Sequence, residues 1–235
     1  MSLPRTILIA RPDPGASETA RLVADMGFEP LLAPALTIQA IAARFPPAKA
    51  VAAVLVTSGN ALVACLPLFR DTPLFAVGDA TAARARGLAF TRVASASGDA
   101  AALAALVARA LRPSDGTLLL ASGRGQGLKL AAVVRKAGFR VLRRVVYASN
   151  PAVALPDAVA EALRAEQVRA VLFFSAETAR AFVRLIGRED LRETVRAVDA
   201  FAIGAAAGMA LQVLPWRRIG VAAKPTQDAM LALLR

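Results

Sequence analysis

Short apolar runs alternate with amphipathic segments along most of the chain, a pattern typical of strands followed by helices. Residues 117–150 give the clearest example. The apolar run at 118–120 predicts a buried parallel strand, and a polar, glycine-rich turn follows it at 122–127. The next segment has helical spacing of its apolar residues and is expected to end at Gly138, a helix C-cap. The stretch 141–147 then predicts a second strand.

The same order of elements occurs earlier, at residues 6–36, so the chain contains an internal repeat. Gly27 aligns with Gly138 and is expected to end the first helix, whose N-cap we assign to Ser17. In the later copy, Asn150-Pro151 is expected to end the second strand.

A further repeated pattern, three strand–helix units long, fills residues 51–110 and recurs over 157–235. Small polar residues or glycines follow the strands in both copies, so that Ser58 corresponds to Ser175. Gly87 is expected to end one of the helices as a C-cap. The predicted strands are 51–56, 74–77 and 91–94 in the first copy, and 170–174, 201–203 and 218–221 in the second.

This alternation predicts an α/β fold with two doubly wound parallel sheets of about five strands each. Right-handed crossovers would place helices on both faces of each sheet. The order of the repeats leaves open whether the first segment of the chain joins the sheet of the 51–110 block or that of the 157–235 block.

Composition then narrows the chemistry. The 235 residues include no histidine and a single cysteine, Cys65. Histidine-based catalysis, a metal site built on a cysteine cluster and an internal disulfide are therefore excluded. The apolar neighbours of Cys65 predict a buried structural thiol. Any catalysis must use carboxylates, hydroxyls, cations or backbone groups, and we expect no metal and no cofactor.

The formal net charge of +12 comes almost wholly from arginine, which suggests an anionic partner or simply the codon usage of a GC-rich genome. With one tyrosine and one tryptophan, the chain lacks the aromatic residues of a nucleic-acid platform, so no nucleic acid is expected. The longest uncharged run, 200–216, is shorter than the roughly 20 residues of a spanning helix and predicts a strand, a turn and a small-residue helix. With no secretory signal recognised, we expect a cytoplasmic protein without membrane contact.

Polar and glycine residues gather where the predicted strands end. Ligands of open parallel sheets bind beyond the carboxyl ends of the strands, and free N–H groups at helix N-termini suit anions. Some of the hydroxyl residues could instead be simple helix caps. The turn at 123–127 is no dinucleotide loop, because its third glycine is one residue early for GxGxxG. The candidate binding residues are Arg11, Thr57, Ser58, Asn60, Thr81, Ser122, Gly123, Arg124, Ser175, Gly204 and Thr226.

Tyr147 is the only tyrosine of the chain and closes the predicted strand at 141–147. A tyrosine in such a place is usually a half-buried packing residue. In a chain without histidine, its hydroxyl is also a candidate proton donor for catalysis.

The motifs, in their order and spacing, resemble those of the uroporphyrinogen-III synthase family along nearly the whole chain. The resemblance implies a discontinuous α/β domain of residues 1–36 and 153–235 and an inserted α/β domain of residues 37–152. Stretches at about 37–50 and 148–156 would form a two-stranded linker between the domains. The matching segments are Arg11-Pro12, 27–34, 56–61, 77–82, 138–147, 173–175, Ile203-Gly204 and 224–226.

The activity implied by the resemblance is that of a lyase that cyclises hydroxymethylbilane to uroporphyrinogen III, with inversion of ring D, in haem biosynthesis. This substrate is a polycarboxylate, which fits the arginine excess and the polar turns. Tyr147 matches the family's recurrent tyrosine and would assist departure of the terminal hydroxyl as a general acid. A monomer without cofactor is expected. Carboxylates would be bound through hydroxyl and backbone groups of Thr57, Ser58, Thr81, Ser175 and Thr226.

Two turns depart from the family pattern. Residues 205–207 are alanines where hydroxyl residues are frequent, so binding there would rest on backbone N–H groups. Ser122 stands where an arginine is frequent, and Arg124 or Lys129 could replace that arginine. The alternative function is a two-lobed α/β protein that binds an anion or a nucleotide without catalysis.

Overall fold

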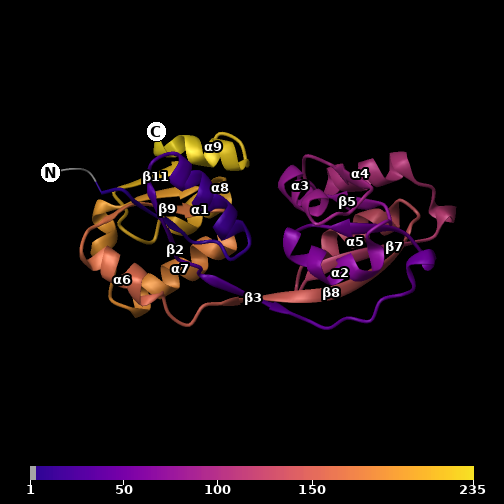
Figure 1. Ribbon diagram of the computed structural model, residues 1–235, viewed down its shortest axis with the longest axis horizontal. Coiled ribbons are helices and arrows are strands. Elements are labelled where there is room, and N and C mark those ends of the chain that lie inside the picture. Colours follow the sequence, from indigo (N-terminus) through magenta and orange to yellow (C-terminus); the bar gives the residue numbers. More distant parts are fainter. Residues whose placement is uncertain (1–3) are drawn as a thin grey trace. The chain divides into compact units, whose positions relative to one another are not determined.

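A computed structural model describes residues 4–235, which form two compact units (Figure 1). Unit 1 contains the chain up to Thr37 and again Asn150–Arg235, and unit 2 contains Ile38–Ser149. Each unit holds one sheet with helices on both faces. The predicted α/β fold with two doubly wound parallel sheets is confirmed, with one antiparallel edge strand, described below, as the exception.

The sheet of unit 1 has the strand order β11-β10-β9-β1-β2, and each neighbouring pair is parallel. Because β1 pairs with β9, the first segment of the chain joins the sheet of the last block. Helices α6, α7 and α8 pack on one face, and α1 and α9 on the other. The strands are β1 (Thr6–Ile9), β2 (Glu29–Leu32), β9 (Val168–Phe173), β10 (Asp199–Ala202) and β11 (Arg218–Val221). The helices are α1 (Gly15–Asp25), α6 (Asp157–Arg164), α7 (Ala176–Arg188), α8 (Ala205–Leu211) and α9 (Gln227–Leu231).

The central strand β9 shows why these strands appear in the sequence as unbroken apolar runs. Val171 and Phe173 belong to the core under α6, α7 and α8, whereas Ala170 and Leu172 belong to the core under α1 and α9. Phe173 meets the ring of Phe182 in α7 edge-on, with 5.3 Å between ring centres. With both faces covered, every position of the strand must be apolar.

The sheet of unit 2 has the strand order β3-β8-β7-β4-β5-β6. All neighbours from β8 to β6 are parallel, whereas β3 runs against β8, with Ile41 bonded to Val146 and Ala152 to Ala35. Helices α2 and α3 cover one face, and α4 and α5 the other. The strands are β3 (Leu36–Ala40), β4 (Val51–Val56), β5 (Leu74–Ala76), β6 (Val93–Ser95), β7 (Thr117–Gly123) and β8 (Arg140–Pro151). The helices are α2 (Leu62–Phe69), α3 (Asp79–Gly87), α4 (Ala100–Ala110) and α5 (Leu128–Lys136).

Strand β8 corrects the prediction that Asn150-Pro151 ends the second strand of the repeat. The strand continues to Pro151. Its parallel pairing with β7 stops at Tyr147, and beyond that point the backbone bonds go to the segment around β3. Proline is tolerated in a strand that has a neighbour on just one side. Its missing N–H then faces the free side and breaks no hydrogen bond of the sheet.

The start of the first helix also differs from the prediction. Helix α1 begins at Gly15, and Ser17 lies inside its first turn. The Oδ1 atom of Asp13 accepts a hydrogen bond from the N–H of Ser17 at 2.9 Å. The carboxylate of Asp13 therefore performs the capping role that we had assigned to Ser17.

The glycine C-caps are confirmed in two of the three predicted cases. Gly27 and Gly138 follow α1 and α5 with φ of 84° and 90°, in the left-handed region that glycine adopts without strain. Gly87 is instead the last residue of α3, and Ala89 takes the left-handed conformation with φ of 63°. The prediction for Gly87 was wrong because the helix runs one residue further than expected and includes Gly87.

Cys65 is fully buried in α2, as predicted for a structural thiol. Burial raises its pKa to about 12, so the nucleophilic thiolate does not form near neutral pH. The uncharged run 200–216 forms the end of β10, a turn and α8. No helix within residues 4–235 is long and apolar enough to cross a membrane.

Asp199 is a carboxylate buried at the start of β10, with a side chain only 4% exposed. Arg217 donates two hydrogen bonds to it at 2.8 Å, and Arg218 donates a third at 3.1 Å. Burial is the largest influence and acts to raise the pKa of Asp199, but the bonds and charges of the two arginines together hold that pKa below its ordinary value. The ion pair therefore stabilises the fold above the ordinary aspartate pKa of about 4, and this stabilisation is lost as pH falls through the folded-state value.

Asp199→Asn is expected to lower the free energy of unfolding by about 1–3 kcal/mol at neutral pH, because two arginines lose their buried counter-charge. Urea unfolding at neutral and acid pH measures the free energy of unfolding of both proteins. The difference between the variant and wild type should be smaller at acid pH. The control Glu193→Gln breaks the exposed pair with Arg196, which solvent screens, and should lower the free energy of unfolding much less than Asp199→Asn does. Equal losses of unfolding free energy in the two variants would contradict a stabilising role of the buried Asp199 ion pair.

Candidate active site

The candidate residues of unit 1 lie at the carboxyl edge of its sheet, the edge at which open parallel sheets bind ligands. Arg11 follows β1, Ser175 follows β9, Gly204 follows β10 and Thr226 precedes α9. The parallel order of the sheet therefore gathers these residues on one side of unit 1.

Arg11 is held in one orientation by its surroundings. Its guanidinium carbon lies 4.4 Å from the centre of the Phe174 ring, and Nη1 donates to Thr19 Oγ1 at 3.4 Å and to Gln227 Oε1 at 3.3 Å. A Cβ atom at Gly15 would lie 2.3 Å from that guanidinium carbon, so only glycine leaves room for it. A planar cation fixed in this way is suited to bind a carboxylate.

Ser175 and Thr226 both cap helices, the alternative role considered for such hydroxyls. Ser175 Oγ accepts from the N–H of Thr178 at 3.1 Å, and Thr226 Oγ1 accepts from the N–H of Ala229 at 3.3 Å. Ser175 Oγ also shares a hydrogen bond of 2.8 Å with Thr178 Oγ1, in which either hydroxyl can donate. A capping hydroxyl uses an oxygen lone pair, and when Thr178 is the donor Ser175 keeps its own O–H for a ligand. Capping and binding of a carboxylate are therefore compatible. Gly204 precedes α8 without any side-chain cap.

In unit 2, Thr57, Ser58 and Asn60 follow β4 at the corresponding edge. Ser58 Oγ accepts from the N–H of Asn60 at 3.3 Å. The side chain of Arg84 in α3 lies over Gly59, where a Cβ atom would be 2.8 Å from Arg84 Cδ. Arg84 thus brings a cation to this turn that the sequence analysis does not single out.

The helix N-termini at this edge differ in whether a carboxylate already occupies them. Asp79 begins α3, and hydrogen bonds with Ser95 and then Ser97 hold its pKa below the ordinary value, so it is charged at neutral pH. Asp99 caps α4 by accepting two backbone N–H bonds at 2.9 Å. Gly127 precedes α5, whose first turn has neither a side-chain cap nor an acidic residue. An external anion would therefore meet free N–H groups at α5.

A hollow of about 510 Å³ opens at this N-terminus of α5, lined by Thr57, Ala100 and residues 125–130. It brings Thr57 to the glycine-rich turn, and the exposed Lys129 borders it. Thr81 lies instead in the first turn of α3, beside the charge of Asp79. Of these two places, the hollow is the better suited to an anion.

Tyr147 is buried, with 2% of its surface exposed, and pairs in register with Gly123 of β7. Its hydroxyl donates to Gln126 Oε1 at 2.8 Å, and its carbonyl oxygen accepts from the N–H of Arg124 at 2.8 Å. The phenol is thus packed more deeply than the half-buried position typical of a strand end, with its proton directed at Gln126.

The position of Ser122 corrects the predicted start of the glycine-rich turn. Strand β7 continues to Gly123, so the turn begins at the exposed residue Arg124. Ser122 is 0% exposed, and its Oγ has no hydrogen-bond partner among the residues that the structure describes. In this conformation its hydroxyl has no access to a ligand.

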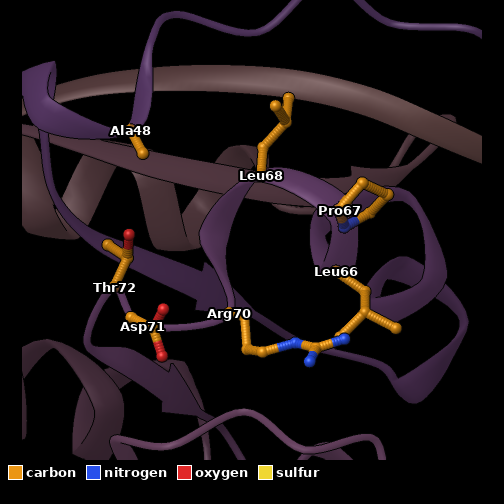
Figure 2. A pocket seen from close by; sticks show the side chains of 7 residues that line it. All are labelled: Ala48, Leu66, Pro67, Leu68, Arg70, Asp71 and Thr72. Atoms are coloured by element: carbon orange, nitrogen blue, oxygen red, sulfur yellow. The ribbon is translucent and has the colours of Figure 1, made fainter.

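A different hollow, of about 420 Å³, lies at the amino edge of the same sheet (Figure 2). Figure 2 shows Arg70, Asp71 and Thr72 after the end of α2, in the segment that leads to β5. The remaining lining residues are Ala48, Leu66, Pro67 and Leu68. No candidate residue lines this hollow, which therefore lies away from the candidate site.

Comparisons with known proteins agree with this architecture. The family model described as uroporphyrinogen-III synthase HemD matches residues 17–232. A search among curated proteins found no match. The alternative of a binding protein without catalysis has no support among these findings.

Two solved structures illustrate the likeness. The chain is similar to uroporphyrinogen-III synthetase from Helicobacter pylori, with a TM-score of 0.64, 18% identity and 98% of each chain covered. It is also similar to a mutant uroporphyrinogen III synthase from Thermus thermophilus, with a TM-score of 0.49, 20% identity and coverage of 100% of this chain and 98% of the other.

The structure from Helicobacter pylori supports the fold alone, whereas the family model spans residues 17–232 and so includes all the turns described above except the one with Arg11. The chain therefore belongs to the uroporphyrinogen-III synthase family, enzymes of haem biosynthesis.

Proposed function

We propose that the protein is a lyase that cyclises hydroxymethylbilane to uroporphyrinogen III with inversion of ring D, releasing water. The observation that supports this most is the hydrogen bond of Tyr147, the only tyrosine, with Gln126, a residue that lines the hollow suited to an anion. The chain has no histidine to act as the acid, so a phenol placed there is the natural proton donor.

The reaction needs one proton at its first step. The terminal hydroxyl of the bilane leaves as water when Tyr147 donates its proton, and the remaining cation is an electrophilic azafulvenium ion. Attack from the substituted carbon of ring D gives a spiro intermediate, which fragments and closes again with the ring inverted. A proton lost from the closing pyrrole carbon balances the proton that Tyr147 supplied.

Selecting this closure over the simpler one requires restraint of a flexible polycarboxylate. Fixed cations and free N–H groups that bind its carboxylates would provide that restraint. In unit 1 we assign this role to Arg11, Ser175, Gly204 and Thr226. In unit 2 we assign it to the N-terminus of α5 with Arg124, and to the polar turns that contain Thr57, Ser58, Asn60 and Thr81.

Ser122 and Gly123, predicted as binding residues, have a different role in this proposal. Both are buried in β7. We infer that they support the turn that carries Arg124 rather than contact the substrate.

We infer that units 1 and 2 are the discontinuous and the inserted domain expected from residues 1–36 with 153–235 and from residues 37–152. The boundaries between units 1 and 2 fall within a few residues of the expected domain boundaries. That the protein is a cytoplasmic monomer without nucleic-acid or membrane partners stays a prediction from the sequence.

Arg11→Lys is expected to raise the KM for hydroxymethylbilane about three- to tenfold, because lysine loses the planar contact with Phe174 and the paired donors. Steady-state kinetics measure it. The matched control is Arg169→Lys, which removes a guanidinium stacked on Phe28 but begins from the amino end of β9. Equal changes in KM for both variants would show that Arg11 binds no substrate.

Tyr147→Phe is expected to lower kcat by about 100-fold with little change in KM, since general acids contribute roughly 10²–10⁴-fold. The measurement is the rate of bilane consumption above its spontaneous closure, after thermal unfolding has shown that the variant is folded. A loss smaller than about tenfold would reduce Tyr147 to a positioning role.

A further inference from the structure

The turn that follows β7 is built around the ring of Tyr147. A Cβ atom at Gly123 would lie 2.8 Å from two carbons of that ring and 3.0 Å from Gln126 Oε1. The N–H of Arg124 donates to the carbonyl oxygen of Tyr147 at 2.8 Å. Gln126 is therefore carried to the phenol by a segment that is already bonded to the strand of Tyr147.

The backbone of Gln126 is itself fixed in place. Its N–H donates to the carbonyl of Gly123 at 3.0 Å, and its carbonyl accepts from Arg143 Nε at 2.9 Å. The residues on either side, Gly125 and Gly127, have φ of 73° and 79°, which a side chain rarely adopts. The side-chain amide of Gln126 thus starts from a fixed point 2.8 Å from the hydroxyl of Tyr147.

The side-chain amide of glutamine can both accept and donate a hydrogen bond, and a general acid needs both from its neighbour as its proton leaves. In the structure, Gln126 Oε1 accepts the proton of the phenol. When Tyr147 turns this proton to a substrate hydroxyl, that acceptor is no longer needed. Rotation of the amide would then bring its NH₂ group to the phenol oxygen, where a donor stabilises the phenolate left after proton transfer.

We propose that Gln126 is a positioning residue for the reaction, which orients the hydroxyl of Tyr147 in the free enzyme and donates to its oxygen as the proton leaves. This inference rests on the proposed function of Tyr147 as the general acid. The inference goes beyond that proposed function because it assigns a role to Gln126, one of the residues that line the hollow at α5.

Two variants separate the accepting from the donating role. Gln126→Met keeps the length of the side chain but removes both functions, and Gln126→Glu keeps an acceptor but has no donor when ionised. Both are expected to lower kcat at least tenfold while KM changes less than about threefold. The matched control, Gln167→Met, changes an exposed glutamine and should leave both constants unchanged. Wild-type kcat in Gln126→Glu would overturn the donating role, and wild-type kcat in both variants would overturn the proposal.

A double-mutant cycle with Tyr147→Phe separates this proposal from the one on which it rests. If Gln126 acts through Tyr147, Gln126→Met should cause no further loss of kcat in the Tyr147→Phe background. A full additional loss there would overturn the inference and leave Tyr147 as the acid. Unchanged kcat in Tyr147→Phe alone would instead show that the proposed acid is wrong.

A spectroscopic readout does not depend on activity. Because the chain has one tyrosine, growth on 3-fluorotyrosine labels position 147 alone. The single ¹⁹F resonance should shift in Gln126→Met, which loses the hydrogen bond, and stay in place in Gln167→Met. An identical resonance in wild type and Gln126→Met would show that the bond is absent in solution and would overturn the proposal.

Discussion

The contact of the Tyr147 ring with the bare backbone of Gly123 is the constraint on which the candidate site depends. The two residues are paired in register across β7 and β8, and a Cβ atom on Gly123 would overlap the ring. The ring can therefore approach the backbone of Gly123 closely, and its hydroxyl reaches Gln126. This arrangement exists because β8 runs parallel to β7, and the pairing of the two strands stops at Gly123 and Tyr147, at the carboxyl edge of the sheet.

The two units solve the problem of binding an anion in different ways. Unit 1 holds a cation, Arg11, between an aromatic ring and two polar side chains. In unit 2, α3 and α4 begin with their own aspartates, whereas α5 begins with Gly127 and leaves its N–H groups to a ligand. The overall charge of +12 is thus less informative than the few places where positive charge or N–H groups are held ready.

Much of the fold could be predicted from the sequence because parallel strands covered on both faces appear as apolar runs, and glycines such as Gly27 and Gly138 end helices at fixed offsets. The continuation of β8 to Pro151 could not, because it depends on pairing with β3, a segment far away in the chain. Asp13 was missed as a cap for a local reason, since Ser17 matched the preferred cap residues equally well.

The candidate site was predicted less completely. The predicted strand ends placed Arg11 and Tyr147 at the correct edge, although β8 continues past Tyr147 and only its pairing with β7 stops there. A strand end does not fix the partners of a side chain. Gln126, Thr19 and Gln227 contact these two residues only after folding, and no spacing in the sequence marks them. Ser122 fits the pattern of a polar turn, yet one more residue of strand buries it.

The central claim, that this chain directs the closure of a tetrapyrrole, is tested most directly by the isomer that it forms. Hydroxymethylbilane, supplied by a coupled enzyme, is incubated with the protein, and the uroporphyrins are oxidised and separated. The account predicts the type III isomer in excess over the spontaneous background, with type I suppressed as the protein concentration rises. Type I alone, from protein with a normal unfolding transition, would contradict the account.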